Sequence, residues 1–240
     1  MKLVKIVLSL LILSQLTIAQ YSEYPMSQVD MSKINMEQFS FGVKVSPTIA
    51  WLNTKHYDLE TDGATMKIGA GIVAKYEINS ILSVISGVNF NGFGGYVFDN
   101  ESLNEIITKD NYKINYFQTE IPLGLRLETL DSKKTNYFLQ GGFLTSFILK
   151  ANEKKQSKIS NSNVIKTDII SFTNPTTLGF FAGIGMQYHI SKSMEIFSDI
   201  NFKSTITNIA NGNEYVLKGI YSESPTILPA SLEIAFGIMF

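Results

Sequence analysis

The chain has 240 residues, a formal net charge of −1 and no cysteine. A charge so close to zero gives no electrostatic footprint for nucleic acid, so we expect no nucleic-acid partner. The lack of cysteine excludes disulfides, thiolate metal sites, cysteine nucleophiles and a lipid-bearing amino-terminal cysteine. The length suits one large all-β domain or two small ones.

Residues 1–19 have the pattern of a cleaved secretory signal peptide. Lys2 and Lys5 form a charged end, an apolar run follows, and Ala19 supplies a small residue at the cut. The alternative is an uncleaved anchor helix, but the run is too short and too interrupted to span a bilayer comfortably. Residues 20–38 are predicted to form a periplasmic lead-in. No later apolar run reaches the roughly 18 residues of a membrane helix, so a membrane crossing has to use strands.

From residue 39 onward, apolar and polar residues alternate in eight segments, which is typical of β-strands. Each segment is close to the length that a tilted membrane strand needs. The predicted strands are residues 39–51, 64–77, 81–91, 116–127, 136–150, 176–190, 194–203 and 228–240.

The connections between these segments alternate between long and short. Outer-membrane barrels have this asymmetry, with long outer loops and short periplasmic turns. A soluble sandwich has no reason to alternate its loop lengths so regularly. We therefore predict an all-β fold, a single antiparallel transmembrane β-barrel of about eight strands over residues 39–240. Its expected location is the outer membrane of a Gram-negative cell envelope.

The segment 116–127 shows why a barrel is favoured over a sandwich. Its odd positions from Phe117 to Leu127 are mostly apolar, whereas its even positions include Glu120, Pro122 and Arg126. In a membrane barrel the apolar face meets lipid and the charges point into the lumen. Glu120 and Arg126 then each need a partner from a neighbouring strand. Pro122 lacks an N–H, so it predicts a local break in the ladder of backbone hydrogen bonds.

The alternation also predicts which charges face the lumen. An eight-stranded barrel is only wide enough to be filled by its own side chains, and buried charges must be paired or stay wet. We favour a salt-bridged, partly hydrated plug over a narrow polar pore, although many inward glycines would leave room for water. The predicted inward charges are Lys44, Lys67, Lys75, Glu77, Glu120, Arg126, Glu195, Asp199, Lys203 and Glu233.

No motif indicates catalysis, a metal or a cofactor. Residues 69–74 match a dinucleotide fingerprint in letters, but the strand period continues through Tyr76 and no helix follows. The two histidines, His56 and His189, are expected at opposite ends of the barrel, so they cannot share a hydrolytic site. His189 is predicted to be a hydrogen-bonded interior residue. We therefore expect neither an enzyme nor a metal or cofactor site, and a lipid-acting enzyme remains the alternative.

Aromatic residues lie near the predicted strand ends. Trp51, Tyr76, Tyr137 and Tyr188 are candidates for the aromatic girdles of a membrane barrel. The final strand ends at Phe240. A terminal aromatic residue after an alternating strand resembles the signal that the barrel insertion machinery reads, so Phe240 is the predicted insertion signal.

The Glu-Ile-Pro-Leu core at residues 120–123 is followed by a strand that contains Gly141 and Gly142. Together with the Ala19–Gln20 junction and Phe240, this pattern resembles the PorT-like outer-membrane β-barrel family. The resemblance implies an integral outer-membrane barrel, usually without a defined activity and without known catalytic residues. The founding member of the family supports a secretion system for virulence proteases.

The expected role is therefore structural, or that of an interaction platform through the outer loops. The expected partners are outer-membrane lipid, the insertion machinery during biogenesis and a protein at the outer loops, and the protein is expected to be a monomer. Besides the lipid-acting enzyme, three further alternatives remain open. They are a narrow passive pore for small solutes, an accessory component of a secretion system, and a soluble lipocalin-like barrel.

Overall fold

The computed structural model describes residues 38–55, 59–99, 102–103, 106–107, 110–129, 134–157, 165–191, 194–211 and 226–240. All of them belong to one unit, Glu37–Phe240. The predicted signal peptide, nearly all of the predicted lead-in and His56 lie outside the described residues. Among the described residues, no helix has the length and apolar content to cross a membrane.

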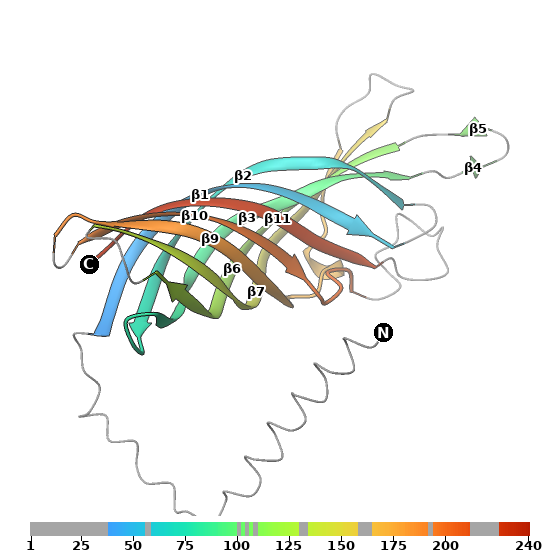
Figure 1. The fold of residues 1–240 in the computed structure, drawn as a ribbon. Coiled ribbons are helices and arrows are strands. Elements are labelled where there is room, and N and C mark those ends of the chain that lie inside the picture. Colours follow the sequence, from blue (N-terminus) through green and yellow to red (C-terminus); the bar gives the residue numbers. More distant parts are fainter. Residues whose placement is uncertain are drawn as a thin grey trace, which may run out of the picture. The chain divides into compact units, whose positions relative to one another are not determined.

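Eight antiparallel strands form a closed ring (Figure 1). Each strand pairs with the next in the ring, and the additional pairing of β6 with β7 closes it. The prediction of a single antiparallel barrel is thus confirmed. In ring order the strands are β1 (Phe39–Thr54), β2 (Leu59–Glu77), β3 (Leu82–Asp99), β6 (Asp110–Glu128), β7 (Thr135–Ser157), β9 (Thr176–His189), β10 (Glu195–Thr205) and β11 (Ile227–Met239).

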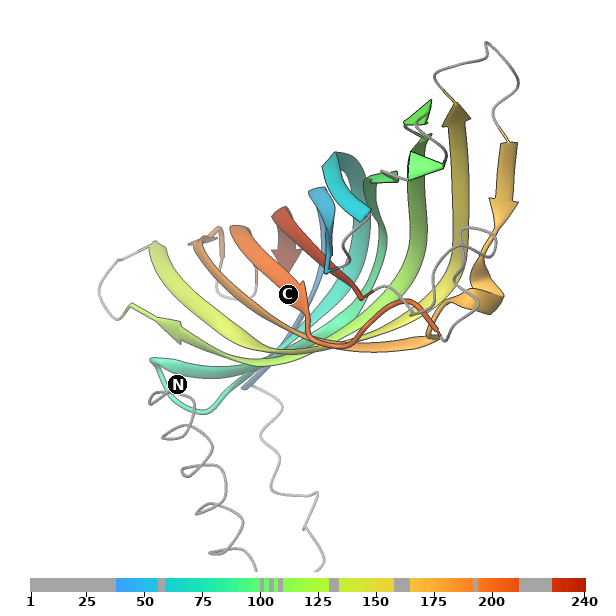
Figure 2. The same ribbon diagram turned by 90° about the vertical axis from the view of Figure 1, so that its right-hand side faces the viewer.

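The two ends of the barrel differ. At the turn end, short turns join β2 to β3, β6 to β7 and β9 to β10, and β11 ends beside the start of β1. At the loop end, β6 and β7 project beyond most other strands (Figure 2). Three small elements belong to this end: β8 (Ile165–Asp168), which pairs with β7, the hairpin of β4 (Ser102–Leu103) and β5 (Ile106–Ile107), and the 3-10 helix η3 (Ile170–Phe172).

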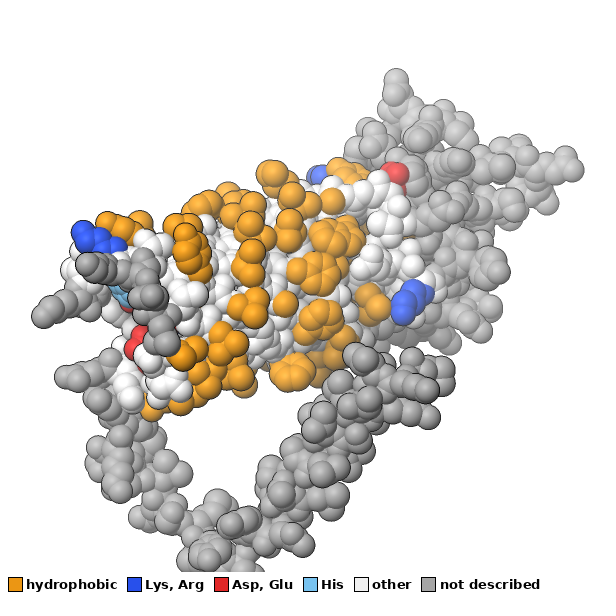
Figure 3. Space-filling view, in the orientation of Figure 1, with side chains coloured by type: hydrophobic (Ala, Val, Ile, Leu, Met, Phe, Trp, Pro, Cys, Tyr) orange, Lys and Arg blue, Asp and Glu red, His pale blue; other side chains and the backbone are white. Residues whose placement is uncertain are grey.

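A belt of exposed apolar side chains crosses the face of the barrel that Figure 3 shows. Exposed apolar side chains lie on all eight strands of the ring. On β6 the belt consists of Phe117, Ile121, Leu123, Leu125 and Leu127. On β7 it includes Phe143, whose exposed fraction is 73%. Exposure of so much apolar surface to water is unfavourable, whereas contact with the acyl chains of a bilayer is not. The alternating pattern of the sequence therefore corresponds to one lipid face and one interior face.

Several strands are longer than the sequence pattern predicts. β3 runs on to Asp99 instead of residue 91, β6 begins at Asp110 instead of 116, and β7 continues to Ser157 instead of 150. The prediction ended the strand at residue 91 because glycines and mixed charge follow, and it limited the other two where the alternation with an apolar face stopped. Beyond the lipid, however, an outward-facing residue has no reason to be apolar, and the ladders continue.

The ladder is interrupted beside Pro122, as predicted. Leu123 pairs with Ser86 of β3, and pairing resumes only at Glu120 with Asn89. On the other side, the register with β7 is unbroken through Pro122 and Leu144. The Ser86 hydroxyl donates to the Pro122 carbonyl oxygen at 2.9 Å. A side chain thus replaces part of the backbone ladder that proline removes.

The inward glycines do not leave open space for water, contrary to the expectation from the sequence. A Cβ atom at Gly185 would collide with the Phe138 ring, and one at Gly237 would collide with the Phe197 ring. A Cβ atom at Gly124 would lie 2.8 Å from the Phe181 ring. These glycines give neighbouring aromatic rings room to lie flat against the barrel wall, as in the aromatic rescue of strand glycines.

Substituting Gly185 with alanine should therefore destabilise the barrel. The added methyl group meets the Phe138 ring and the Ser198 carbonyl oxygen, and overpacking of this kind costs about 1–3 kcal/mol. Urea unfolding in phospholipid vesicles measures the effect. Gly92→Ala is the matched control, because its Cβ would meet only the flexible Lys67 side chain at 3.4 Å. Equal stability of the two variants would contradict the packing role of Gly185.

Candidate functional site

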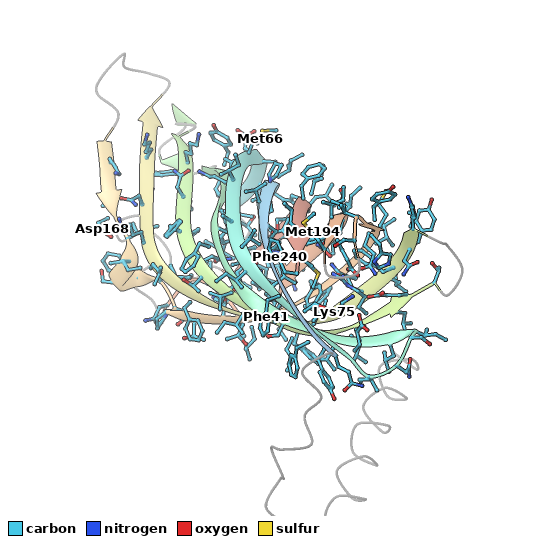
Figure 4. All side chains as sticks on the ribbon, turned by 90° about the vertical axis from the view of Figure 1, so that its left-hand side faces the viewer. Phe41, Met66, Lys75, Asp168, Met194 and Phe240 are labelled. Atoms are coloured by element: carbon cyan, nitrogen blue, oxygen red, sulfur yellow. The ribbon has the colours of Figure 1, made fainter. Side chains whose placement is uncertain are left out.

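The barrel interior is the candidate site, and it has three layers. A turn-end cluster surrounds Lys75, a central ion network surrounds Lys203 and Glu233, and a loop-end apolar cluster surrounds Leu52 and Ile209. Figure 4 shows Lys75 and Phe240 well away from Asp168, which lies on the projecting loop end.

The turn-end cluster holds one buried ammonium among three carboxylates. Lys75 Nζ lies 2.9 Å from Glu77, 3.6 Å from Glu128 and 3.6 Å from Glu195. The second partner of Glu195 is His189, whose Nδ1 is 2.8 Å from the carboxylate. Gln187 donates to Glu128 at 2.8 Å. These contacts link β2, β6, β9 and β10, so they connect strands that are not neighbours in the ring.

The central ion network is a chain of four charges. Glu233 of β11 is completely buried and accepts hydrogen bonds from Lys44 at 2.8 Å and Lys203 at 2.7 Å. Lys203 also lies 2.7 Å from Glu120 of β6. Glu120 accepts two further hydrogen bonds, from Asn91 at 2.6 Å and Gln118 at 2.8 Å. Two positive and two negative charges thus compensate one another, as buried charges require.

A relay of amides connects Arg126 to Asp199. Arg126 donates to Gln140 Oε1 through Nε at 3.1 Å and Nη2 at 2.8 Å. The Gln140 amide donates to Asn201 at 2.7 Å, and Asn201 donates to Asp199 at 2.6 Å. The guanidinium also stacks 3.8 Å from the centre of the Phe138 ring. The two opposite charges are therefore joined by hydrogen bonds without touching.

Two cavities beside the interior networks are small. A cavity of about 40 Å³ is lined by residues that include Arg126, Gln140 and Asp199, and a second of about 20 Å³ lies near Gln118 and Ser146. A water molecule needs roughly 10–15 Å³ of such volume, so each cavity suits only a few waters. The buried Arg126 Nη1, which has no protein partner, is the group such a water would satisfy.

The loop-end apolar cluster lies beyond the ion network, toward the loop end of the barrel. Wall residues such as Leu52, Phe93 and Ile114 contact Ile169 and Ile209, which come from the connections that precede β9 and β11. The two connections are joined to each other by a bridge between Thr173 and Ala210. The buried members of the cluster are Ala50, Leu52, Phe93, Val97, Ile114, Tyr116, Ile148, Ala151, Ile169, Ile209, Ala210 and Ile227.

Nine of the ten charges predicted to face the lumen take part in these interior networks. Their side chains are largely buried apart from Glu77, whose exposed fraction is 44% at the turn end. They are Lys44, Lys75, Glu77, Glu120, Arg126, Glu195, Asp199, Lys203 and Glu233.

Lys67 lies elsewhere. Its Nζ donates to Asn115 Oδ1 at 2.7 Å, and Asn115 alternates with the buried Ile114 and Tyr116, so it lies on the outer face of β6. The register between β2 and β3 shifts between Ala64 and Gly69. A β-bulge of this kind redirects a side chain, and here it turns Lys67 outward.

The charged partner of Glu120 is also different from the sequence expectation. Asn91 of the neighbouring β3 donates to Glu120 at 2.6 Å, as expected, but the opposite charge comes from Lys203 of β10, across the lumen. Arg126, in contrast, contacts Gln140 of the neighbouring β7.

Sequence reasoning missed the neutral members of the networks and one charge. Asn91, Gln140 and Asn201 carry hydrogen bonds between the charged groups, and Glu128 contacts Lys75. Glu128 has a recognisable signal, because it continues the inward face of Arg126 one step beyond the predicted end of that strand. The amide side chains have no such sequence signal, because an inward-facing polar residue can equally well contact water.

The structure places residues 69–74 and His189 in strands of the barrel wall. Residues 69–74 lie within β2, and Gly69 and Gly71 face the side chains of Asn91 and Asn89 instead of opening a helix. His189 is half-buried, with Nε2 3.3 Å from Asn136 Nδ2. Within the part of the chain that the structure describes, no group of three His, Cys, Asp or Glu residues could hold a metal ion.

Removal of the Glu233 carboxylate should destabilise the barrel strongly. Glu233→Ala leaves Lys44 and Lys203 with one carboxylate between them, and breaking a buried ion pair costs about 3–5 kcal/mol. Glu77→Ala is the control, since its half-exposed pair with Lys75 should contribute less than about 1 kcal/mol. Urea unfolding in phospholipid vesicles measures the free energy of unfolding of both variants. A loss at position 233 no larger than that at position 77 would refute the central role of the network.

Structural comparison finds barrels of low sequence identity. The attachment invasion locus protein Ail of Yersinia pestis is 10% identical, covers 85% of this chain and 99% of its own, and has a TM-score of 0.38. The outer membrane protein OprG from Pseudomonas aeruginosa is 11% identical, with coverages of 84% and 96% and a TM-score of 0.46. The outer membrane protease OmpT from Escherichia coli is 7% identical, with the same coverages and TM-score. No curated protein matches the chain.

A family model described as outer membrane protein beta-barrel domain matches residues 19–211. This match covers most of the chain, including the first seven strands of the ring. It agrees with the apolar belt and the closed ring of strands. In outer-membrane barrels the short turns generally face the periplasm and the long loops face the cell exterior. The chain therefore belongs to the outer membrane protein β-barrel domain family, and the protein is an integral component of the outer membrane.

Proposed function

We propose that this protein is a non-conducting outer-membrane barrel that acts as a structural element or as an interaction platform through its loop end. The sealed interior carries this proposal. Charged residues fill the centre of the barrel, and the loop-end apolar cluster covers them. What remains for a partner is the outside of the projecting strands and the loops that they carry.

The observations favour this role over a narrow pore. A conducting lumen needs a wide wet path, whereas the two interior cavities lined by charged residues among the described residues have volumes of only about 40 and 20 Å³. A hydrophobic constriction also blocks ions, because water leaves it readily. The loop-end apolar cluster is such a constriction, and it is held by backbone hydrogen bonds from Ile209 to Ile227 and from Asn174 to Ile209.

We also infer that the chain is a PorT-like member of the outer-membrane barrels. Residues 120–123 and the pair Gly141 and Gly142 support this assignment, and Glu120 lies at one end of the central ion network. A supporting role in a secretion system is the second candidate function, which rests on that resemblance. Neither candidate requires catalysis, and we propose that the protein is a monomer and not an enzyme.

Export and insertion complete the proposal. Residues 1–19 would direct the chain to the periplasm and be removed there, and Phe240 would be read by the insertion machinery. Phe240 exchanges two backbone hydrogen bonds with Phe41, of 2.7 and 3.1 Å, so it lies at the seam where the last strand meets the first. Its exposed fraction is 63%, which leaves the ring accessible.

Conductance in planar bilayers tests the sealed interior. The wild-type barrel should produce no single-channel steps, because the loop-end apolar cluster and the ion network fill the lumen. Steps whose ion selectivity changes in a Lys203→Glu variant would show that current passes through the barrel, and would overturn the proposal. A well-characterised porin, reconstituted by the same route, is the positive control.

The role of Phe240 is tested by comparing assembly in cells with unassisted refolding. Phe240→Ala should lower the amount of barrel in the outer membrane severalfold, but should leave refolding into detergent unchanged, since the side chain is exposed. Phe236→Ala is the control, because Phe236 is also exposed on β11. An equal loss in both variants would mean that Phe240 acts only as an ordinary lipid-facing residue.

A further inference from the structure

The outer face of the projecting strands is strongly basic. Lys113 of β6, Lys154 of β7 and Lys166 of β8 lie directly opposite one another in the register, and Tyr96 of β3 continues the row. Lys113 Nζ lies 5.0 Å from the centre of the Tyr96 ring. Because Lys113 alternates with the buried Tyr112 and Ile114, this row faces outward.

Two more lysines extend this row toward the apolar belt. Lys150 is exposed and pairs with Phe117, the last belt residue of β6. The turned-out Lys67 reaches Asn115, and the charges of Lys113 and Lys154 repel its ammonium. We call the set of Lys67, Lys113, Lys150, Lys154 and Lys166 the basic face.

The charges of the basic face are not compensated by the described residues around it. Neighbouring strands are about 4.8 Å apart, and like charges directly opposite destabilise a sheet. None of the salt bridges among the described residues involves these five lysines. Asp168 lies on the same face beside Asn152, and its Oδ1 accepts a hydrogen bond from the Ile170 N–H at 2.9 Å. Its single negative charge offsets only part of the five positive charges. The arrangement is therefore suited to an external anion.

The depth of the basic face indicates which anion it meets. On β7, exposed apolar residues run from Tyr137 to Leu149, and Lys150 follows at once. At about 3.3 Å per residue and a tilt of roughly 40°, this stretch spans about 30 Å along the membrane normal, the thickness of the hydrocarbon core. The lysines thus begin where lipid headgroups begin, on the side that faces the cell exterior.

We propose that the basic face binds the phosphate groups of the phosphorylated glycolipid in the outer leaflet. The aliphatic stems of Lys150 and Lys67 would lie along the acyl-chain boundary, and the ammonium groups of the outward row would contact the headgroup phosphates. Bound lipid would offset the repulsion within the row. It would also fix the projecting strands relative to the membrane surface.

Lipid binding to the reconstituted barrel tests this proposal. The probe is diphosphoryl lipid A in nanodiscs of phosphatidylcholine, and the readout is the apparent Kd by native mass spectrometry. Each lysine near an anionic lipid surface contributes roughly fivefold, so the double variant K113Q/K154Q should bind about 25-fold more weakly. K134Q is the matched control, because Lys134 is exposed at the turn end and should not affect binding.

A second lipid probe and a folding check complete the experiment. The wild-type barrel should bind dephosphorylated lipid A much more weakly, and this arm needs no variant that has to fold. Heat-dependent gel mobility verifies that each variant is a folded barrel. Equal binding of the two lipids, or equal binding by wild type and K113Q/K154Q, would overturn the proposal. It would also be overturned if the wild type bound a soluble sulfated polysaccharide but not lipid A.

Discussion

Ring closure is the constraint on which the rest of this structure depends. In hydrocarbon, no water is available for backbone N–H and C=O groups, so a sheet can cross the membrane only if it has no free edge. The pairing of β6 with β7 removes that edge. With only eight strands the ring is narrow, and its interior has to be filled by its own side chains. Closure thus fixes both the pairing of the backbone and the packing of the lumen.

The narrow lumen explains why the interior charges are arranged as a chain. Lys203 reaches Glu233 on the neighbouring strand and Glu120 on the opposite wall, so a single ammonium ties the two sides together. Amide side chains extend this connection from Arg126 to Asp199. A polar core of this kind is stable only when almost every member is satisfied, which favours a fixed, non-conducting interior over a mobile one.

The fold can be predicted from the sequence more completely than the side-chain contacts can. Alternation alone identifies the eight strands and the inward face of Glu120 and Arg126, because lipid and lumen demand opposite side-chain chemistry. It cannot show that Glu120 pairs with Lys203, since the two residues are 83 positions apart and meet only when the ring closes. It also misplaces Lys67, because a bulge in β2 leaves no mark on the alternation. The predicted strand ends are wrong for a related reason. Beyond the lipid, the strands lose the apolar outer face on which the prediction depends, and their sequence then resembles that of a loop.

In the strands that project beyond the lipid, the inner face remains buried, whereas the outer face changes from apolar to polar residues. Tyr112, Ile114 and Tyr116 of β6 remain buried on the inner face, where Ile114 and Tyr116 belong to the loop-end apolar cluster, whereas the outer face changes from Phe117 to Asn115 and Lys113. The proposed sealing of the lumen therefore depends on residues outside the hydrocarbon core, not on the charged centre alone. Polar groups at the centre could hydrate, but water would have to cross this apolar cluster first. The same extension carries part of the loop-end apolar cluster and the basic face, so the proposed sealing and the proposed lipid binding depend on one structural feature.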